Sequence, residues 1–208
     1  MRLSRGLIAL CLLLLLQACA STPPQQAAQS TASQVLYTQH LRDLAAINSF
    51  SLQGRIGVQA DGKGFSGSLH WQHTQNRDDI ELFSPLGGQV ANIQKTAEQV
   101  TLIEANGKRT SADNAETLTA EVLGWRLPLS GLADWSLGRP TQNAVLHSTW
   151  DARGYLRTLK QDGWDIEYQA YSAYNGQFLP TKISLKSEKL NLKLVVEMWL
   201  ASDKPSLD

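Results

Sequence analysis

Cysteine is scarce in this 208-residue chain: there are two, Cys11 and Cys19, and both lie in its first 19 residues. The rest of the sequence therefore has no disulfide, and its stability must come from an ordinary apolar core. Charge is balanced, with 19 basic and 19 acidic residues and no basic run, so nucleic acid is not an expected partner. No second long apolar stretch follows the first, so we expect any further membrane contact to be local.

The sequence also has few groups suited to catalysis. It contains no Gly-x-Ser-x-Gly elbow and no phosphate loop, and His70 and His73 are spaced to point to opposite faces of a strand. Residues 62–67 match the dinucleotide-binding fingerprint, but a strand pattern follows them where that motif needs a helix, so we expect a hairpin there. We therefore expect a binding protein and not an enzyme, with no metal site and no cofactor.

The N-terminus is typical of a secretory signal. Arg2 and Arg5 precede an apolar run over residues 7–16, which has the length of a signal-peptide core and is too short to span a bilayer as a helix. Leu16, Gln17, Ala18 and Cys19 come next, and they resemble the lipobox of bacterial lipoprotein precursors. Gln17 is a minor departure, because a small or apolar residue is usual at its position. The alternative is a plain secretory signal with a coincidental cysteine.

The lipobox resemblance implies that residues 1–18 are removed, which leaves 190 of the 208 residues with Cys19 first. The Cys19 thiol would then carry diacylglycerol and its amine an acyl chain. Without Arg2 and Arg5 the mature chain has 17 basic and 19 acidic residues. The second mature residue is Ala20 and not Asp, so the resemblance implies sorting to the outer membrane, with the domain facing the periplasm.

The mature chain divides into a tether and one domain. Residues 19–33 are rich in Pro, Gln, Ala, Ser and Thr, which predicts a lipidated N-terminus and a flexible tether with a root-mean-square span of roughly 20 Å. Residues 34–208 suffice for one sizeable domain. The domain opens with a predicted amphipathic helix over residues 35–47, in which Leu36 shares the apolar face with His40 and Leu44.

From Phe50 onward the apolar period changes to two, which predicts β-strands. Hairpin turns are expected at Asn106-Gly107, Asp162-Gly163 and Asn175-Gly176, and later strands at residues 100–104, 164–168, 181–187 and 190–199. Helices are expected at residues 114–123, which Gly124 ends, and at residues 129–137. The pattern predicts a mainly β (α+β) fold: one strongly curved, barrel-like antiparallel sheet with helices packed against its apolar face.

The strand alternation also predicts which side chains line the inside of the curved sheet. They are Phe50, Leu52, Ile56, Val58, Leu69, Trp71, Ile80 and Leu82. The chain has six tryptophans and only four phenylalanines, and most single tryptophans are best interpreted as core. A concave apolar face nevertheless leaves a cavity where the helices do not fill it, so these eight residues are candidates for acyl-chain contact.

One predicted loop contains a single large apolar residue. Pro85 and Gly87 flank Leu86 between two strands. Such a leucine usually packs beneath its own loop. The alternative is that it projects into solvent, which is unfavourable unless it meets an apolar partner such as a membrane.

The sequence resembles the LolB family, the outer-membrane lipoprotein receptors of Gram-negative bacteria. The resemblance covers essentially the whole chain and is most specific in the middle, although Trp125 stands where a smaller or unbranched apolar residue is expected. Several segments carry the resemblance: the lipobox at Cys19, the Ser84-Pro85-Leu86-Gly87 loop, Asn106-Gly107-Lys108, Asp113-Asn114-Ala115-Glu116 and Glu197-Met198-Trp199. The most specific segment is the run Leu123-Gly124-Trp125-Arg126-Leu127-Pro128-Leu129, which is followed by Leu132, Trp135, Leu137, Gly138 and Pro140.

This resemblance implies an incomplete antiparallel barrel, capped by helices, with a hydrophobic cavity for lipoprotein acyl chains. It further implies a monomer that accepts lipoproteins from the periplasmic carrier LolA and places them in the inner leaflet of the outer membrane, with Pro85, Leu86 and Gly87 as the membrane-insertion loop. Two alternatives remain at this stage. One is a structural or assembly lipoprotein with a filled core and no acyl ligand. A lipid hydrolase is a more distant one, because the sequence has no nucleophile constellation.

Overall fold

The computed structural model describes residues 30–60 and 62–200, which form three helices and one antiparallel sheet of 11 strands. In chain order the elements are α2 (Thr31–Ala45), β1 (Phe50–Ala60), β2 (Lys63–Thr74), β3 (Arg77–Phe83), β4 (Gln89–Lys95), β5 (Val100–Glu104), β6 (Arg109–Ala112), α3 (Ala115–Leu123), α4 (Leu129–Ser136), β7 (Val145–Trp150), β8 (Leu156–Gln161), β9 (Trp164–Tyr174), β10 (Gln177–Lys186) and β11 (Leu190–Leu200).

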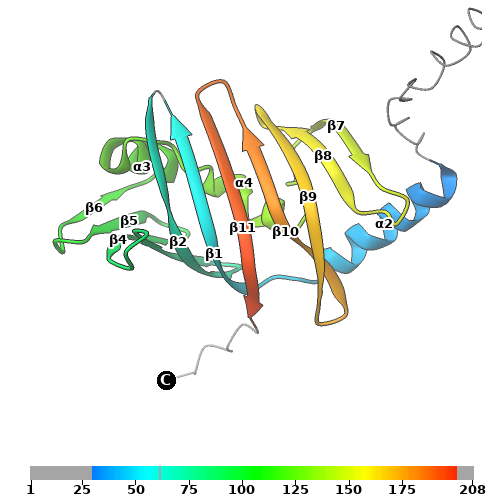
Figure 1. Ribbon diagram of the computed structural model, residues 1–208, viewed down its shortest axis with the longest axis horizontal. Helices are drawn as coiled ribbons and strands as arrows, with labels where there is room; N and C mark the ends of the chain where they lie inside the picture. Colours follow the sequence, from blue (N-terminus) through cyan, green and yellow to red (C-terminus); the bar gives the residue numbers. More distant parts are fainter. Residues whose placement is uncertain (1–29, 61, 201–208) are drawn as a thin grey trace, which may run out of the picture.

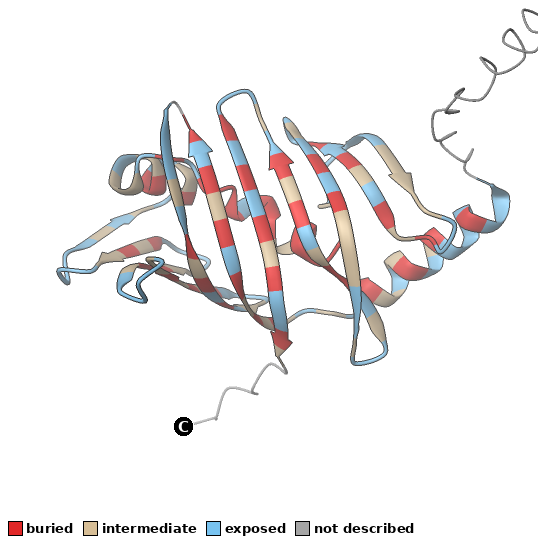
Figure 2. Ribbon diagram, in the orientation of Figure 1, coloured by how far each residue is buried: buried red, intermediate tan, exposed pale blue. Residues whose placement is uncertain are grey.

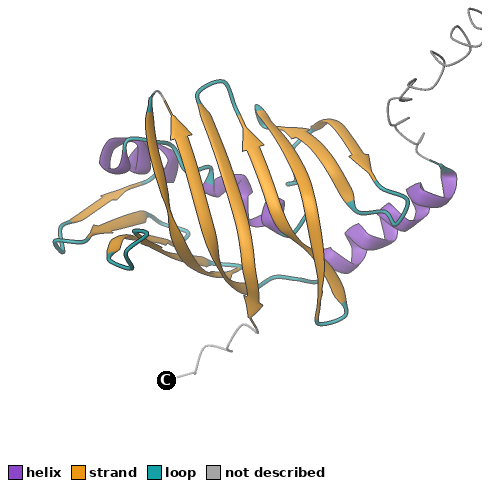
Figure 3. Ribbon diagram, in the orientation of Figure 1, coloured by secondary structure: helices purple, strands orange, loops and turns teal. Residues whose placement is uncertain are grey.

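The sheet is two meanders joined in its middle. Strands β1 to β6 lie in chain order from the middle of the sheet to one edge. Strands β7 to β11 lie in chain order from the other edge back to the middle, where β11 pairs with β1. The edge strands β6 and β7 are not paired with each other in the described chain. The sheet curves, and α3 and α4, which connect its two edges, lie behind it in Figures 1 and 3. The predicted incomplete, strongly curved antiparallel barrel is confirmed.

Burial alternates along the strands, which gives the sheet a covered inner face and a solvent-facing outer face (Figure 2). The register places inner-face residues in rows across neighbouring strands. One such row is Leu52, Trp71, Ile80, Ile93 and Leu102, each exposed by no more than 1%. Burying one large apolar side chain stabilises the folded state by about 1.5–3 kcal/mol, so these rows supply the core that the absence of disulfides requires.

The three predicted turns are present, and those at Asp162-Gly163 and Asn175-Gly176 have the backbone of a two-residue hairpin. Asp162 and Asn175 adopt positive φ values of 52° and 46°, and each is followed by a glycine that is also at positive φ. Two consecutive left-handed residues match the right-handed twist of a two-residue hairpin. Residues 63–67 belong to β2, so the glycine-rich fingerprint is part of a hairpin, as expected. A side chain at Gly67 would collide with the Phe83 carbonyl of the neighbouring strand, which explains that glycine without any nucleotide.

Helix α3 ends as predicted and begins one residue later than expected, at Ala115. The Asn114 side chain caps it by accepting a hydrogen bond from the Thr117 N–H at 2.8 Å, and Gly124 ends it at φ +82°. Helix α4 ends one residue earlier than expected, at Ser136. None of the helices in residues 30–60 and 62–200 is long and apolar enough to cross a membrane.

Helix α2 differs from the expectation in its bounds and in its buried face, and it ends two residues earlier than expected, at Ala45. It begins at Thr31, because the Ser30 hydroxyl caps it by accepting from the Ser33 N–H at 3.1 Å, so residues 31–33 are helical and not tether. Its apolar face is centred on Tyr37, which stacks on Trp150 with ring centroids 4.3 Å apart. Leu36, expected on that face, is 47% exposed. Successive residues lie 100° apart around a helix axis, so a small error in the predicted orientation of the helix exchanges a buried residue with its exposed neighbour.

Candidate lipid-binding site

The loop between β3 and β4 presents Leu86 to solvent, with 98% of the residue exposed. The loop is a hydrogen-bonded turn: the Gly87 N–H donates to the Ser84 carbonyl at 2.9 Å, and the Ser84 N–H donates to the Gly88 carbonyl at 2.8 Å. Pro85 has a fixed φ, and Gly87 adopts φ +85°, a conformation that favours glycine. The interpretation that Leu86 packs beneath its loop is therefore wrong.

The eight residues predicted to face inward are all buried on the inner face of β1, β2 and β3, with exposures between 0% and 5%. Phe50 also lines a pocket of about 350 Å³ at the start of β1, together with Leu179 and Trp199. The other seven do not line the pockets described here, because they pack against one another and against their neighbours in the core. An acyl chain reaches them only if some of that packing opens.

A more accessible apolar pocket lies at the opposite end of the strands, where β1 ends and β11 begins, and we call it the rim pocket. Its walls are Trp125, from the connection between α3 and α4, and Trp164, at the start of β9. The lining residues are Ala60, Ala120, Gly124, Trp125, Arg126, Gly163, Trp164, Ser187, Glu188, Lys189 and Leu190. Its volume of about 450 Å³ falls within the usual range for small-molecule sites.

The rim pocket combines an apolar floor with a charged edge. Trp125 is 6% exposed and packs nearly parallel to Phe65, with ring centroids 6.2 Å apart. Arg126 and Lys189 are exposed at the edge, and neither forms an ion pair within the described residues. Sequence reasoning placed the cavity on β1 to β3 and did not identify this pocket. The available signal was Trp125, a large aromatic side chain where the family pattern predicts a smaller or unbranched apolar residue.

Polar groups are buried in the other half of the core. All five tyrosines belong to α2, β9 or the turn before β8. Burial raises the pKa of Tyr168 and Tyr171 well above that of a free tyrosine, so both hydroxyls stay protonated. The Tyr171 hydroxyl donates to the Leu156 carbonyl at 2.7 Å, whereas those of Tyr168 and Ser136 are buried without a hydrogen-bond partner. Ser136 and Tyr168 are both 0% exposed and line neither the rim pocket nor the pocket beside Phe50, so their hydroxyls lie in the closed core.

The fold recurs in solved structures of low sequence similarity. A LolA superfamily protein from Nitrosomonas europaea aligns with a TM-score of 0.53 and 10% identity, covering 85% of this chain and 96% of its own. A DUF1329 family protein from Desulfovibrio piger aligns with a TM-score of 0.50 and 7% identity, covering 85% and 94%. At such identities the likeness concerns the fold alone. The open sheet, the helices on its inner face and the apolar rim pocket define an open half-barrel with an apolar pocket at its rim.

Sequence comparison places the chain within that class. The family model described as outer membrane lipoprotein LolB matches residues 48–199. Outer-membrane lipoprotein LolB of Pseudomonas fluorescens is 35% identical over 196 residues, covering 94% of this chain and 96% of that protein. The protein of the same name from Stutzerimonas stutzeri is 34% identical over 199 residues, covering 96% and 97%. The chain belongs to the LolB family.

Membership of this family supports a lipoprotein-receptor role and does not favour the alternative of a structural lipoprotein with a filled core. Cys19, the predicted lipidation site, lies outside the described residues.

Proposed function

We propose that this protein is the outer-membrane receptor that accepts lipoproteins from the periplasmic carrier LolA and inserts them into the inner leaflet of the outer membrane. The observation that carries the proposal is the family match over residues 48–199. The apolar rim pocket and the fully exposed Leu86 agree with it, because one suits an acyl chain and the other a membrane surface.

The energetics of acyl chains explain why such a receptor is needed. Exposing a chain of roughly fifteen methylenes to water costs about 12 kcal/mol, at about 0.8 kcal/mol for each. A multiply acylated protein therefore does not diffuse freely across the periplasm, and each transfer must pass from one apolar site to another. The described chain contains no phosphate loop, so transfer here would follow a gradient of affinity from carrier to receptor to bilayer.

We assign the acyl chain to the rim pocket, with the inward residues of β1 to β3 as the surface that it reaches when the core packing opens. These are Phe50, Leu52, Ile56, Val58, Leu69, Trp71, Ile80 and Leu82. Residues 1–18 would be the signal peptide, and lipidation of Cys19 would hold the domain near the membrane through the tether. Leu86, between Pro85 and Gly87, would then contact the bilayer surface and orient the domain.

Binding of a fluorescent acyl probe tests the proposal. The Cys19→Ala protein, produced without residues 1–18 and otherwise unaltered, should bind the probe. Ala120→Trp fills the rim pocket and should weaken binding, whereas Ala173→Trp on the exposed part of β9 should not. A folded domain that does not bind the probe would instead be the structural lipoprotein.

A further inference from the structure

The rim pocket continues onto the outer face of the sheet. It shares Gly163, Ser187 and Glu188 with a small groove that crosses the rim between the β8–β9 and β10–β11 turns. That groove in turn shares Lys160, Asp165 and Lys186 with a larger depression of about 680 Å³ across the outer face. The inner pocket, the rim groove and the outer depression thus adjoin one another through shared lining residues, and we call the three together the path.

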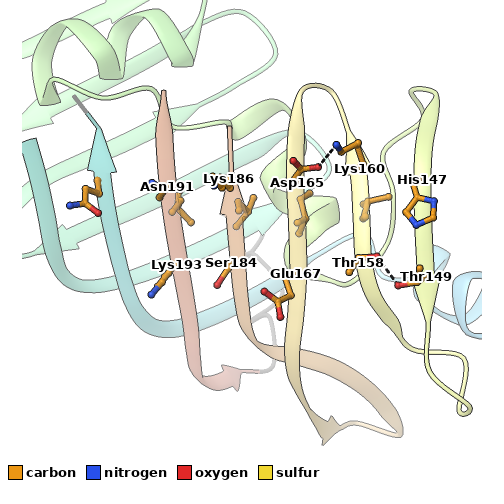
Figure 4. A pocket seen from close by; sticks show the side chains of 15 residues that line it. His147, Thr149, Thr158, Lys160, Asp165, Glu167, Ser184, Lys186, Asn191 and Lys193 are labelled. Atoms are coloured by element: carbon orange, nitrogen blue, oxygen red, sulfur yellow. Dashed lines mark hydrogen bonds and ion pairs between the residues drawn. The ribbon is translucent and has the colours of Figure 1, made fainter. Parts of the chain in front are cut away.

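The outer depression, which we call the outer groove, crosses six strands from β1 to β7. Figure 4 shows its side chains projecting from the sheet, with the helices on the far side. Hydroxyl, amide and charged side chains line it on the outer face, among them Asp165, Glu167, Ser184, Lys186, Asn191 and Lys193. The five gaps between six strands span about 24 Å, which is the length of about seven extended residues.

The residue types that line the path change along its length, from tryptophans at the inner end to side chains with polar or charged ends in the outer groove. Trp125 and Trp164 line its inner end, and Leu146, 73% exposed, lies where it crosses the rim. In the outer groove both signs of charge are present. Lys160 pairs with Asp165 at 3.0 Å, as the dashed line in Figure 4 indicates. No ion pair within the described residues involves Lys186, Lys193 or Glu167.

This lining fits a peptide better than a lipid headgroup. An anionic headgroup or a polyanion would favour a groove of one sign, whereas hydroxyls, amides and charges of both signs suit the N–H and C=O groups of an extended backbone. Because the inner end of the same path is apolar, the ligand that fits the whole path is amphipathic, with an acyl chain joined to a polar polypeptide. An acylated N-terminal cysteine followed by its own chain has this composition.

We propose that the outer groove binds the extended polypeptide segment that follows the acylated cysteine of a client lipoprotein, while an acyl chain occupies the rim pocket. This inference rests on the proposed receptor function. The chain's own sequence offers a model of such a segment, since residues 20–30 are uncharged and rich in Pro, Gln, Ser and Thr. A synthetic peptide of residues 19–30, diacylated on its cysteine and labelled at its C-terminus, is therefore a suitable probe.

Photo-crosslinking tests the location of the peptide. A benzophenone amino acid replaces Lys186 in the Cys19→Ala protein and, as the matched control, Lys182. Both are exposed lysines on the outer face of β10, and Lys182 lines neither the groove nor the rim pocket. We expect the labelled lipopeptide to crosslink at position 186 and not at position 182. Equal crosslinking at both positions, crosslinking at neither while the lipopeptide is bound, or crosslinking at 186 only to a second copy of the chain would overturn the inference.

An affinity measurement separates this inference from the proposed function. The lipopeptide should bind roughly tenfold more tightly than the same diacylated cysteine without its peptide. Ser184→Trp obstructs the groove and should abolish that difference without weakening binding of the lipid alone, whereas Ser66→Trp on the outer face of β2 should preserve it. If neither ligand binds the protein with its groove and rim pocket unsubstituted, the proposed function itself fails. If both bind equally well, only the inference fails.

Discussion

The indole N–H of Trp135 donates a hydrogen bond of 3.0 Å to the side-chain oxygen of Gln161, deep in the core, where the two residues are 1% and 0% exposed. The contact joins α4 to the end of β8. Gln161 also accepts from the Thr141 N–H at 3.0 Å and donates to the Asn143 carbonyl at 2.8 Å. One buried amide therefore attaches the edge hairpin and the segment before it to the helix that covers the inner face.

Gln161→Leu should lower the free energy of unfolding by about 2 kcal/mol or more, because it leaves the buried indole N–H without a partner and removes the hydrogen bonds of Gln161 to the backbone of Thr141 and Asn143. Urea denaturation measures the change. Gln72→Leu, on the exposed outer face of β2, is the matched control and should change the stability by less than about 0.5 kcal/mol. Equal losses in the two variants would show that the buried amide contributes nothing particular.

His40 should make the stability depend on pH. It is buried on α2 beside Tyr155, and burial lowers its pKa, although Asp43 and Asp151 act in the opposite direction. The unfolded chain then binds a proton more readily than the folded one, so stability falls as the pH decreases through about 6.5, the ordinary histidine value. His40→Gln should lose less stability than the wild type between pH 7 and pH 5. If the free energy of unfolding falls equally with pH in the two proteins, this account of His40 is contradicted.

The anchor can be tested independently of the domain. Cys19→Ala should yield a protein without acyl chains that no longer fractionates with outer membranes, while its circular dichroism and melting remain unchanged because no disulfide is lost. Mass spectrometry of the wild type should detect the acyl groups. A variant that still floats with membranes after a high-salt wash would show that something other than Cys19 anchors the protein.

The inner face of β1 should tolerate no charge. Leu52→Asp places a carboxylate at a position with 0% exposure, so it should destabilise the domain by about 3 kcal/mol or more and weaken binding of the acyl probe. Ser51→Asp, one residue away on the outer face, should have little effect on either property. A Leu52→Asp protein that is folded and binds the probe normally would remove this part of the strand from the proposed acyl surface.

Much of this fold could be predicted from local patterns. The alternation from Phe50 onward identified the first strands, and the three Asx-Gly turns fixed hairpins, because each pattern depends on residues close in sequence. Strands β4 and β7 had no predicted counterpart. β7 is an edge strand whose exposed residues include Val145 and Leu146 and whose alternation is broken by bulges. The pairing of β1 with β11 joins distant segments, and no local pattern encodes it.

The candidate site was predictable only in part. The Pro-Leu-Gly loop identified Leu86, but whether the side chain projected or packed depended on a turn geometry that the sequence alone left open. The rim pocket combines residues from β1, α3, β9 and β11 with the turns beside them, so its lining follows from tertiary packing and not from any motif.

Leu86→Glu should separate two steps of the proposed function. The side chain is 98% exposed and outside the core, so folding and acceptance of cargo should persist. Burying one leucine in a bilayer is worth roughly 1.5–3 kcal/mol, which is enough to orient a tethered domain but not to hold one on a membrane. Insertion of cargo should therefore fail in this variant. Met198→Glu, at an exposed apolar residue on β11, is the control and should behave as the wild type.

The most direct measurement is a two-stage transfer assay, in which a labelled lipoprotein passes first from the carrier to this protein and then to liposomes. The account predicts that the wild type completes both stages and that Leu86→Glu completes the first and retains its cargo at the second. A wild-type protein that leaves the cargo on the carrier would contradict the receptor function. A Leu86→Glu variant that delivers cargo at the wild-type rate would contradict the role of the loop.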